Sequence, residues 1–208
     1  MILRRDILHL FHDNALGGHS GHQATWRNLS SLFYWKGLSR DVRQHIRTCT
    51  VCQRGKTECV ASLGLLQPLP IPENIWVDIS MDFIEGLPKS LGKEVIMVVV
   101  DRFSKYAHFV ALCHPFSVAT VAQAFMDQIY KLHGIPETIV TDRDSIFTSN
   151  FWQCLFKIQG VGLHPSIAYH PQSDGQTEVV NRCLEGYLRC MCMECPQDWV
   201  KWLSLAEC

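Results

Sequence analysis

Three carboxylates in this chain have the types and positions that suit one chemistry. Asp82 lies in a segment of alternating apolar and polar residues, Asp142 follows a short β-branched segment, and Glu178 opens a long helical segment. Asp142 and Glu178 are separated by 35 residues. Two divalent cations about 3.5–4 Å apart need anionic oxygen ligands that hold them and offset their charge. If the three carboxylates converge, they form a two-metal site that cuts or joins nucleic-acid backbones.

Each of these carboxylates has an acidic neighbour that competes for its role. Asp78 shares a strand face with Asp82. Asp144 follows Asp142 by two residues, and Asp174 has the N-cap position of the long helix. Taken singly, such an acid is more often a solvated or capping residue than a metal ligand. The chosen three gain weight from their places in mid-strand, at a strand's end and at a helix start, from which a sheet can present side chains to one site.

A second group of residues, at the front of the chain, has the donor types of a zinc site. It has the spacing His-x6-His-x29-Cys-x2-Cys and comprises His12, His19, Cys49 and Cys52. Zn²⁺ prefers four tetrahedral nitrogen and sulfur ligands, and a Cys-x2-Cys turn presents two thiolates to one ion. A module of about 50 residues buries little apolar surface, so the metal would supply much of its folding free energy. We therefore expect a closed, structural zinc site.

Other histidines and cysteines lie outside this pattern. His22 competes most directly for the metal because two residues separate it from His19, whereas His9 is not part of the pattern and His45 is expected to face solvent. Four late cysteines have no metal-ligand spacing, and we expect unpaired helix and loop thiols there. They are Cys183, Cys190, Cys192 and Cys195.

The front of the chain has the periodicity of short helices. Apolar residues recur at helical spacing in residues 1–12, 22–33 and 39–48. Ser39 is the expected N-cap of the third helix.

A proline-containing segment separates this front from the remainder. In residues 57–75, apolar residues alternate with Pro68, Pro70 and Pro72, which favours an extended linker. We therefore predict a small α-helical zinc-binding module at residues 1–56, a linker at 57–75 and a second domain at 76–208.

The second domain alternates strands and helices. Strands are predicted at residues 76–84, 95–101, 106–112 and 138–141, helices at 117–133, 149–159 and 175–193, and a further strand before the last helix. Residues 76–84 alternate in polarity, so that Asp78, Ser80 and Asp82 share one face. Residues 95–101 are apolar almost throughout, as in a strand buried on both faces. This order predicts an α/β fold with a mixed sheet flanked by helices.

Charge is distributed unevenly along the chain. Residues 1–60 contain nine Lys/Arg and four Asp/Glu, whereas residues 61–208 contain ten and sixteen. A basic front fits contact with phosphates, although a solvated surface explains it equally well. The longest aliphatic run, residues 95–100, is too short to span a membrane, and the chain does not start with a secretory signal. We therefore expect an intracellular protein with reduced thiols and no membrane partner.

Several short motifs combine these residues in an order that resembles one family. The front motifs are residues 16–21, 33–35 and 49–54, and the later motifs are residues 80–84, 100–105, 141–144 and 168–178. Together they resemble the integrases of Ty3/gypsy-type long-terminal-repeat retrotransposons, relatives of the retroviral integrases. The resemblance covers essentially the whole chain.

This resemblance implies an RNase H-like core, catalytic Mg²⁺ or Mn²⁺, and DNA as the substrate. By position it assigns catalysis to Asp82, Asp142 and Glu178, and structural zinc binding to the His₂Cys₂ set. The implied reactions are trimming of the element's DNA 3′ end and transfer of that end to target DNA, with two metals at the reacting phosphorus. The family also implies action in the nucleus and, for the complete protein, a homo-oligomer.

Four residues are predicted to contact nucleic acid. Asn181 and Arg182 lie on the helix face that carries Glu178 and could reach phosphates, with a solvated face as the alternative. Tyr169 could line a DNA channel, and Lys105, which follows a predicted strand, could contact a phosphate. Structural packing is the alternative for Tyr169.

The last residues, 199–208, resemble the start of the family's final core helix. We therefore expect a core that is incomplete at its C-terminus, in a segment of a longer polyprotein. Two functions of different class follow from the sequence. One is a polynucleotidyl transferase, and the other is a catalytically inert zinc- and nucleic-acid-binding remnant. A ribonuclease H would share the carboxylates but would not explain the front zinc module.

Overall fold

The computed structural model of this chain describes residues 2–15, 17–55, 72–141, 149, 152, 161–165 and 175–207. The chain divides into two compact units. The helical unit comprises residues 1–60 with 183–206 and 208, and the sheet unit comprises residues 61–182 with 207. The linker predicted at residues 57–75 lies mostly outside the described residues, so the predicted domain limits stay a prediction.

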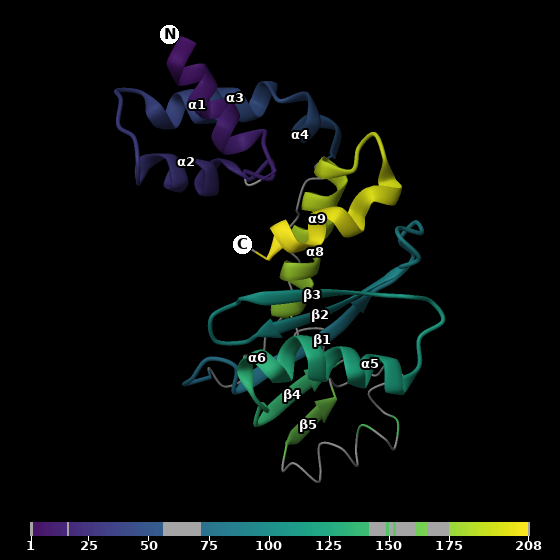
Figure 1. Cartoon of the computed structure of the whole chain (residues 1–208). Coiled ribbons are helices and arrows are strands. Elements are labelled where there is room, and N and C mark those ends of the chain that lie inside the picture. The colour runs from purple at the N-terminus through teal and green to yellow at the C-terminus, as the bar shows by residue number, and fades with distance from the viewer. Residues whose placement is uncertain are drawn as a thin grey trace. The chain divides into compact units, whose positions relative to one another are not determined.

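Short helices form the front of the helical unit. They are α1 (Ile2–His12), α2 (His22–Ser30), α3 (Leu38–Thr48) and α4 (Thr50–Gly55) (Figure 1). The same unit contains the second half of α8 (Gly175–Met191), the 3-10 turn η3 (Pro196–Asp198) and α9 (Trp199–Ala206). The first three helices confirm the predictions for the front of the chain, whereas periodicity does not predict α4.

A small apolar core joins the first three helices. Its buried members are Leu8 of α1, Leu29 of α2, and Leu38 and Val42 of α3. Trp35, in the turn between α2 and α3, packs against this core, and its indole N–H donates a hydrogen bond to Asp41 over 3.0 Å. Four buried side chains are few for a module of this size, so a further source of folding free energy is needed.

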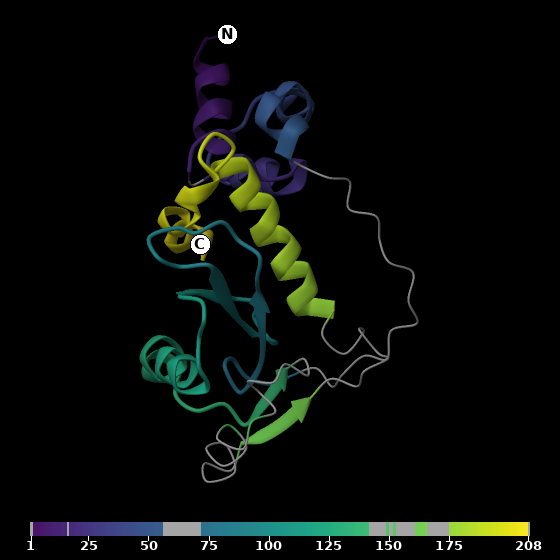
Figure 2. The ribbon, with the colours of Figure 1, turned by 90° about the vertical axis from the view of Figure 1, so that its right-hand side faces the viewer.

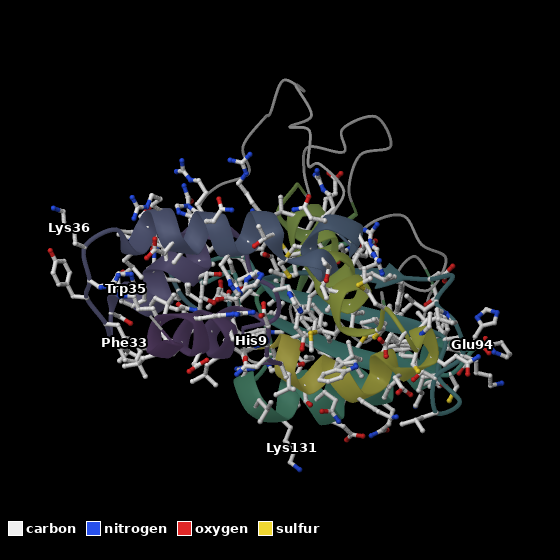
Figure 3. The ribbon with its side chains drawn as sticks, turned by 90° about the horizontal axis from the view of Figure 1, so that it is seen from above. His9, Phe33, Trp35, Lys36, Glu94 and Lys131 are labelled. Carbon is white, nitrogen blue, oxygen red and sulfur yellow. The ribbon has the colours of Figure 1, made fainter. Side chains whose placement is uncertain are left out.

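The turn between α2 and α3 decides where α3 begins. Figure 3 shows Trp35 and Lys36 in this turn. Gly37 has a left-handed φ of 90°, and α3 begins at the next residue. The prediction of Ser39 as the N-cap is therefore wrong. Ser39 lies inside the helix, where its hydroxyl contacts the His22 Nε2 atom at 3.3 Å.

The sheet unit is built on one mixed, five-stranded sheet. Its strands are β1 (Asp78–Ile84), β2 (Val95–Asp101), β3 (Ala107–Leu112), β4 (Thr138–Thr141) and β5 (Gly162–Pro165), in the order β3-β2-β1-β4-β5. β2 pairs antiparallel with β1 and β3, whereas β4 pairs parallel with β1 and β5. The predicted mixed sheet and its five strands are confirmed.

Helical segments cover this sheet. The segment between β3 and β4 runs as α5 (Val118–Phe125), the π-helical turn η1 (Met126–Tyr130) and α6 (Lys131–His133), and it crosses one face of the strands in Figure 1. Ser117 caps its start by accepting a hydrogen bond from the Thr120 N–H. Residues from this helix and the sheet form the core, among them Ile79, Met81, Met97, Val99, Phe125 and Ile129. The first turns of α8 lie beside the sheet (Figure 2).

One predicted element falls largely outside the described ranges. Residues 150–151 and 153–160 of the helix predicted at 149–159 are not among them, although Trp152 is fully buried in the core of the sheet unit. Within the described ranges, no helix combines the length and apolar character that crossing a membrane requires.

Candidate metal centres

The four predicted zinc ligands converge in the helical unit. His12 ends α1, His19 lies in the turn that follows, Cys49 precedes α4, and Cys52 lies within α4. One donor atom from each lies within 4.8 Å of the other three. His12, His19 and Cys52 are buried.

The distances between these donors fit a tetrahedral zinc ion. Zinc bonds of about 2.3 Å to sulfur and about 2.0–2.1 Å to nitrogen place neighbouring sulfur and nitrogen ligands roughly 3.6 Å apart. The Cys52 sulfur lies 3.3 Å from His12 Nε2 and 3.9 Å from His19 Nδ1. The Cys49 sulfur lies 3.4 Å from His19 Nδ1. Two cysteine sulfurs and two imidazoles at these separations fit the donor set of a closed structural site.

A tight glycine turn brings the two histidines together. The His19 N–H donates to the His12 carbonyl over 2.9 Å, and both Gly18 and His19 have left-handed φ angles, of 53° and 51°. A Cβ atom at Gly17 would lie 2.6 Å from the Phe11 carbonyl oxygen. Glycine at position 17 therefore allows the chain to turn back on the end of α1.

The remaining front histidines make other contacts. His9 Nδ1 and His45 Nε2 each approach the Asp13 carboxylate to 3.2 Å. The prediction that His45 faces solvent is wrong, because its side chain is only 19% exposed. His22 Nε2 lies 3.2 Å from the Ser39 carbonyl, away from the four converging donors.

Asp82 lies on the polar face of β1, in the sheet unit. Its Oδ1 atom accepts a hydrogen bond from the Phe83 N–H over 2.8 Å, and its Oδ2 atom accepts one from the Asn181 amide over 2.7 Å. These two donors orient the carboxylate from its own strand and from α8. An oxygen donor held in this way is suited to a hard divalent cation.

The first turns of α8 place Glu178 next to the residues that contact β1. Thr177, directly before Glu178, meets Ser80 of β1 with 2.6 Å between the two hydroxyl oxygens. Asn181, one turn later, holds Asp82. Glu178 is 58% exposed and forms an ion pair of 3.1 Å with Arg182. The structure thus brings the α8 segment that carries Glu178 onto the β1 segment that carries Asp82.

Two predicted site residues, Asp142 and Tyr169, lie outside the described residues. The described part of β4 ends at Thr141, which pairs with Met81 in the parallel ladder. In this register, the last described residue of β4 lies opposite Met81, the residue before Asp82. The catalytic assignment of Asp142 stays a prediction from the sequence.

The described nucleic-acid candidates occupy different places. The Asn181 amide donates a hydrogen bond to Asp82, and Arg182 forms an ion pair with Glu178. Lys105 lies in the turn after β2, at φ 68°, where its ammonium donates to the Arg102 carbonyl. Burial and the charge of Arg102 lower the pKa of Lys105, despite the opposing effect of a nearby carboxylate.

Asp101, at the end of β2, organises the turn that contains Lys105. Its carboxylate accepts hydrogen bonds from the backbone N–H groups of Trp76, Phe103 and Ser104, and from the Ser104 hydroxyl. Burial opposes its ionisation, but these hydrogen bonds prevail, so the pKa of Asp101 lies below its ordinary value. Sequence reasoning did not single out this residue. The sequence does contain a signal for this turn, because Asp101 ends an apolar strand and a serine follows three residues later.

Comparison with known proteins matches both parts of the chain. Residues 2–58 match the integrase zinc binding domain, and residues 74–171 match the integrase core domain. The Tf2-3 and Tf2-4 transposon polyproteins of Schizosaccharomyces pombe are 35% identical to this chain over 205 residues, which is 99% of the chain. The chain spans only 15% of the length of these relatives.

Solved integrase structures share the fold. The HTLV-2 integrase catalytic core domain in complex with magnesium, in its dimeric form, matches 64% of this chain and 84% of its own length, at 19% identity and a TM-score of 0.51. A simian T-cell lymphotropic virus intasome in complex with PP2A regulatory subunit B56 gamma matches 91% of this chain and 64% of its own, at 19% identity and a TM-score of 0.56. The chain therefore belongs to the integrase family, as a zinc-binding domain followed by an RNase H-like core of the kind found in Ty3/gypsy-type transposon polyproteins.

Proposed function

We propose that this chain forms the zinc-binding and catalytic parts of an enzyme that inserts retrotransposon DNA into target DNA. One observation carries the proposal. The start of α8, with Glu178, is tied to the polar face of β1 beside Asp82. The relatives are transposon polyproteins, and a solved neighbour is an intasome, which supports this direction.

Asp82 and Glu178, with Asp142 as the third member predicted from the sequence, would hold divalent cations. Carboxylate oxygens are the donors that Mg²⁺ prefers, and Mn²⁺ takes similar ligands. When bound, such ions supply Lewis-acid stabilisation to the attacking and leaving oxygens of an in-line displacement at phosphorus.

The side chains supply orientation and charge around the reacting phosphate. Asn181 and the Phe83 N–H fix the Asp82 carboxylate, so little reorganisation is needed at the moment of reaction. Arg182, one helical turn after Glu178, offers a guanidinium to a DNA phosphate. The proposed reactions are hydrolytic trimming of a DNA 3′ end, and attack of the resulting 3′-hydroxyl on a phosphodiester of target DNA.

The His₂Cys₂ site has a different proposed role. All four donors are protein groups, and such closed sites stabilise folds rather than carry out chemistry. DNA ends and target DNA are the proposed partners, in the nucleus, with further copies of the protein completing the assembly.

The proposal is tested by strand transfer in the complete integrase encoded by the same element. Glu178→Gln should lower the transfer rate by roughly 100-fold or more, because metal-bound transition-state stabilisation is worth several kcal/mol. Glu185→Gln is the matched control, because Glu185 forms the same type of i,i+4 ion pair, with Arg189 at 3.2 Å.

Near-normal transfer by Glu178→Gln would contradict the catalytic assignment. An inactive wild type that still binds zinc and DNA would instead support the inert remnant.

A further inference from the structure

A buried pair of hydroxyl groups connects β1 to α8 next to the proposed catalytic carboxylates. The Ser80 and Thr177 oxygens are 2.6 Å apart, although the two residues are 97 positions apart in the chain. Both side chains are almost completely buried. Hydroxyl groups removed from water in this way are stable only when they are hydrogen-bonded, so the contact favours one arrangement of helix on strand.

The pair lies directly beside both carboxylates. Ser80 precedes Asp82 by two residues and therefore shares its strand face, as the pleat requires. Thr177 is the residue before Glu178, in the first turn of α8. A displacement of the hydroxyl pair would therefore move a carboxylate on at least one of the two elements.

A second contact fixes the orientation that the first leaves open. One turn after Thr177, Asn181 donates to Asp82 over 2.7 Å. The two contacts are four residues apart on α8 and two residues apart on β1. A single contact would let the helix pivot about it, whereas two contacts along the same line fix both its rotation and its position along the strand.

We propose that Ser80 and Thr177 are positioning residues, whose hydroxyl pair sets the register of α8 on β1 and thereby the separation of Asp82 and Glu178. The inference rests on the proposed function, because the separation matters only if the two carboxylates serve a common metal site. Mg²⁺ demands near-ideal octahedral ligand geometry at about 2.0–2.1 Å. A productive site therefore tolerates displacements of only roughly 0.5 Å, so a shift of α8 along β1 would weaken metal binding.

The size of the two side chains supports this role. Ser and Thr are small enough for the helix backbone to approach the strand closely, and their hydrogen bond is directional. An apolar pair of the same size would fill the space without fixing the register. A merely structural contact would change the free energy of unfolding but not the affinity of a correctly folded protein for metal.

The test measures Mn²⁺ binding to the zinc-loaded chain by isothermal titration, alongside urea unfolding. Thr177→Val keeps the shape and removes the hydroxyl, and it should raise the Mn²⁺ dissociation constant about 10-fold or more, as loss of outer-sphere partners does in metal sites. Ser80→Ala should have the same effect, and the double variant should be no worse than either single variant. Thr177→Ser, which retains the hydroxyl, should bind nearly as the wild type does.

Thr120→Val is the matched control. Thr120 also pairs with a serine hydroxyl, Ser117, at 3.0 Å, but both side chains are exposed at the start of α5 and are not part of the contact between β1 and α8. Its Mn²⁺ affinity should be unchanged.

Wild-type affinity in folded Thr177→Val and Ser80→Ala variants would overturn the positioning role and leave the proposed function standing. Absence of Mn²⁺ binding by the wild type would overturn both. If Thr177→Val fails to fold, the Mn²⁺ affinity of Ser80→Ala tests the positioning role, since this variant removes only one oxygen atom.

Discussion

The two candidate metal centres differ in how their donors are arranged. The zinc donors come from one short stretch of chain, between residues 12 and 52, and three of the four ligands are buried. Asp82 and Glu178 come from elements far apart in sequence, and Glu178 is 58% exposed. A buried set with four protein donors is typical of a structural metal, whereas an open set of oxygens leaves room for substrate.

The difference extends to what holds each centre in place. Backbone geometry shapes the zinc centre, through the left-handed turn at Gly18 and His19 and the close approach at Gly17. Side-chain hydrogen bonds between two elements shape the carboxylate centre, through Ser80–Thr177 and Asn181–Asp82. Damage to the first should therefore unfold its module, whereas damage to the second should spare the fold and weaken function.

Loss of a zinc ligand should have the largest effect. Cys52→Ser should abolish stoichiometric zinc binding and unfold residues 2–55, because structural zinc contributes roughly 10–16 kcal/mol of apparent binding free energy in zinc-finger peptides. Zinc content by mass spectrometry and helical circular dichroism would measure this. Cys113→Ser, at an exposed cysteine, should keep one zinc per chain. A Cys52→Ser protein with full zinc content would contradict the role of Cys52 in a structural zinc centre.

Loss of the Asn181 amide should have an intermediate effect, on function alone. Asn181→Ala removes the donor that orients Asp82, so we expect about a 10-fold loss of metal affinity or activity. Asn181→Asp should be worse, because a second carboxylate would then lie against the first. Metal dependence of strand transfer in the complete integrase would check both. If Asn181 served DNA binding alone, the variants would weaken DNA affinity and leave metal affinity unchanged.

Sequence reasoning succeeds where local chemistry decides the structure. Residues 95–101 are apolar almost throughout and form the predicted strand, and the four zinc donors follow from residue type and spacing. It fails where the conformation of a turn, or a contact between residues distant in sequence, decides the structure. The left-handed Gly37, not Ser39, sets the start of α3.

The support around the carboxylates could not be predicted for the same reason. Asn181 shares a helix face with Glu178, which suggests an outward contact with DNA. The pairing of α8 with β1 also brings its amide to Asp82, a contact that helix periodicity does not predict. The same pairing joins Ser80 to Thr177, and no local pattern connects positions so far apart in sequence.

The smallest expected effect concerns a cluster away from both centres. His133 stacks on Trp76 with ring centroids 3.7 Å apart, and its Nε2 atom lies 2.8 Å from that of His108. Burial and the charge of His108 lower the pKa of His133, although Asp101 opposes this. In Glu207, burial opposes ionisation, but hydrogen bonds from His108 and a backbone N–H lower its pKa overall.

These shifts give the cluster a defined pH dependence. Because the pKa of His133 is lower in the folded protein, the unfolded chain binds more protons below pH 6.5, the ordinary pKa of histidine. The stabilisation is present above that pH and decreases as the pH falls. The contribution of Glu207 is lost at lower pH, below its ordinary value of 4.5.

Urea unfolding between pH 7.5 and 5 would measure this decrease, and His133→Asn should reduce it. If the free energy of unfolding depends on pH equally in the wild type and in His133→Asn, His133 does not contribute to the acid sensitivity.

The central claim is that the region of Asp82 and Glu178 holds the catalytic divalent metal, separately from the structural zinc. Paramagnetic broadening of amide signals by Mn²⁺, in the zinc-loaded protein, tests it most directly. We predict that broadening centres on β1 near Asp82 and on the first two turns of α8. Broadening centred on Glu185, Arg189 or the zinc module, with β1 and the start of α8 unaffected, would contradict the account.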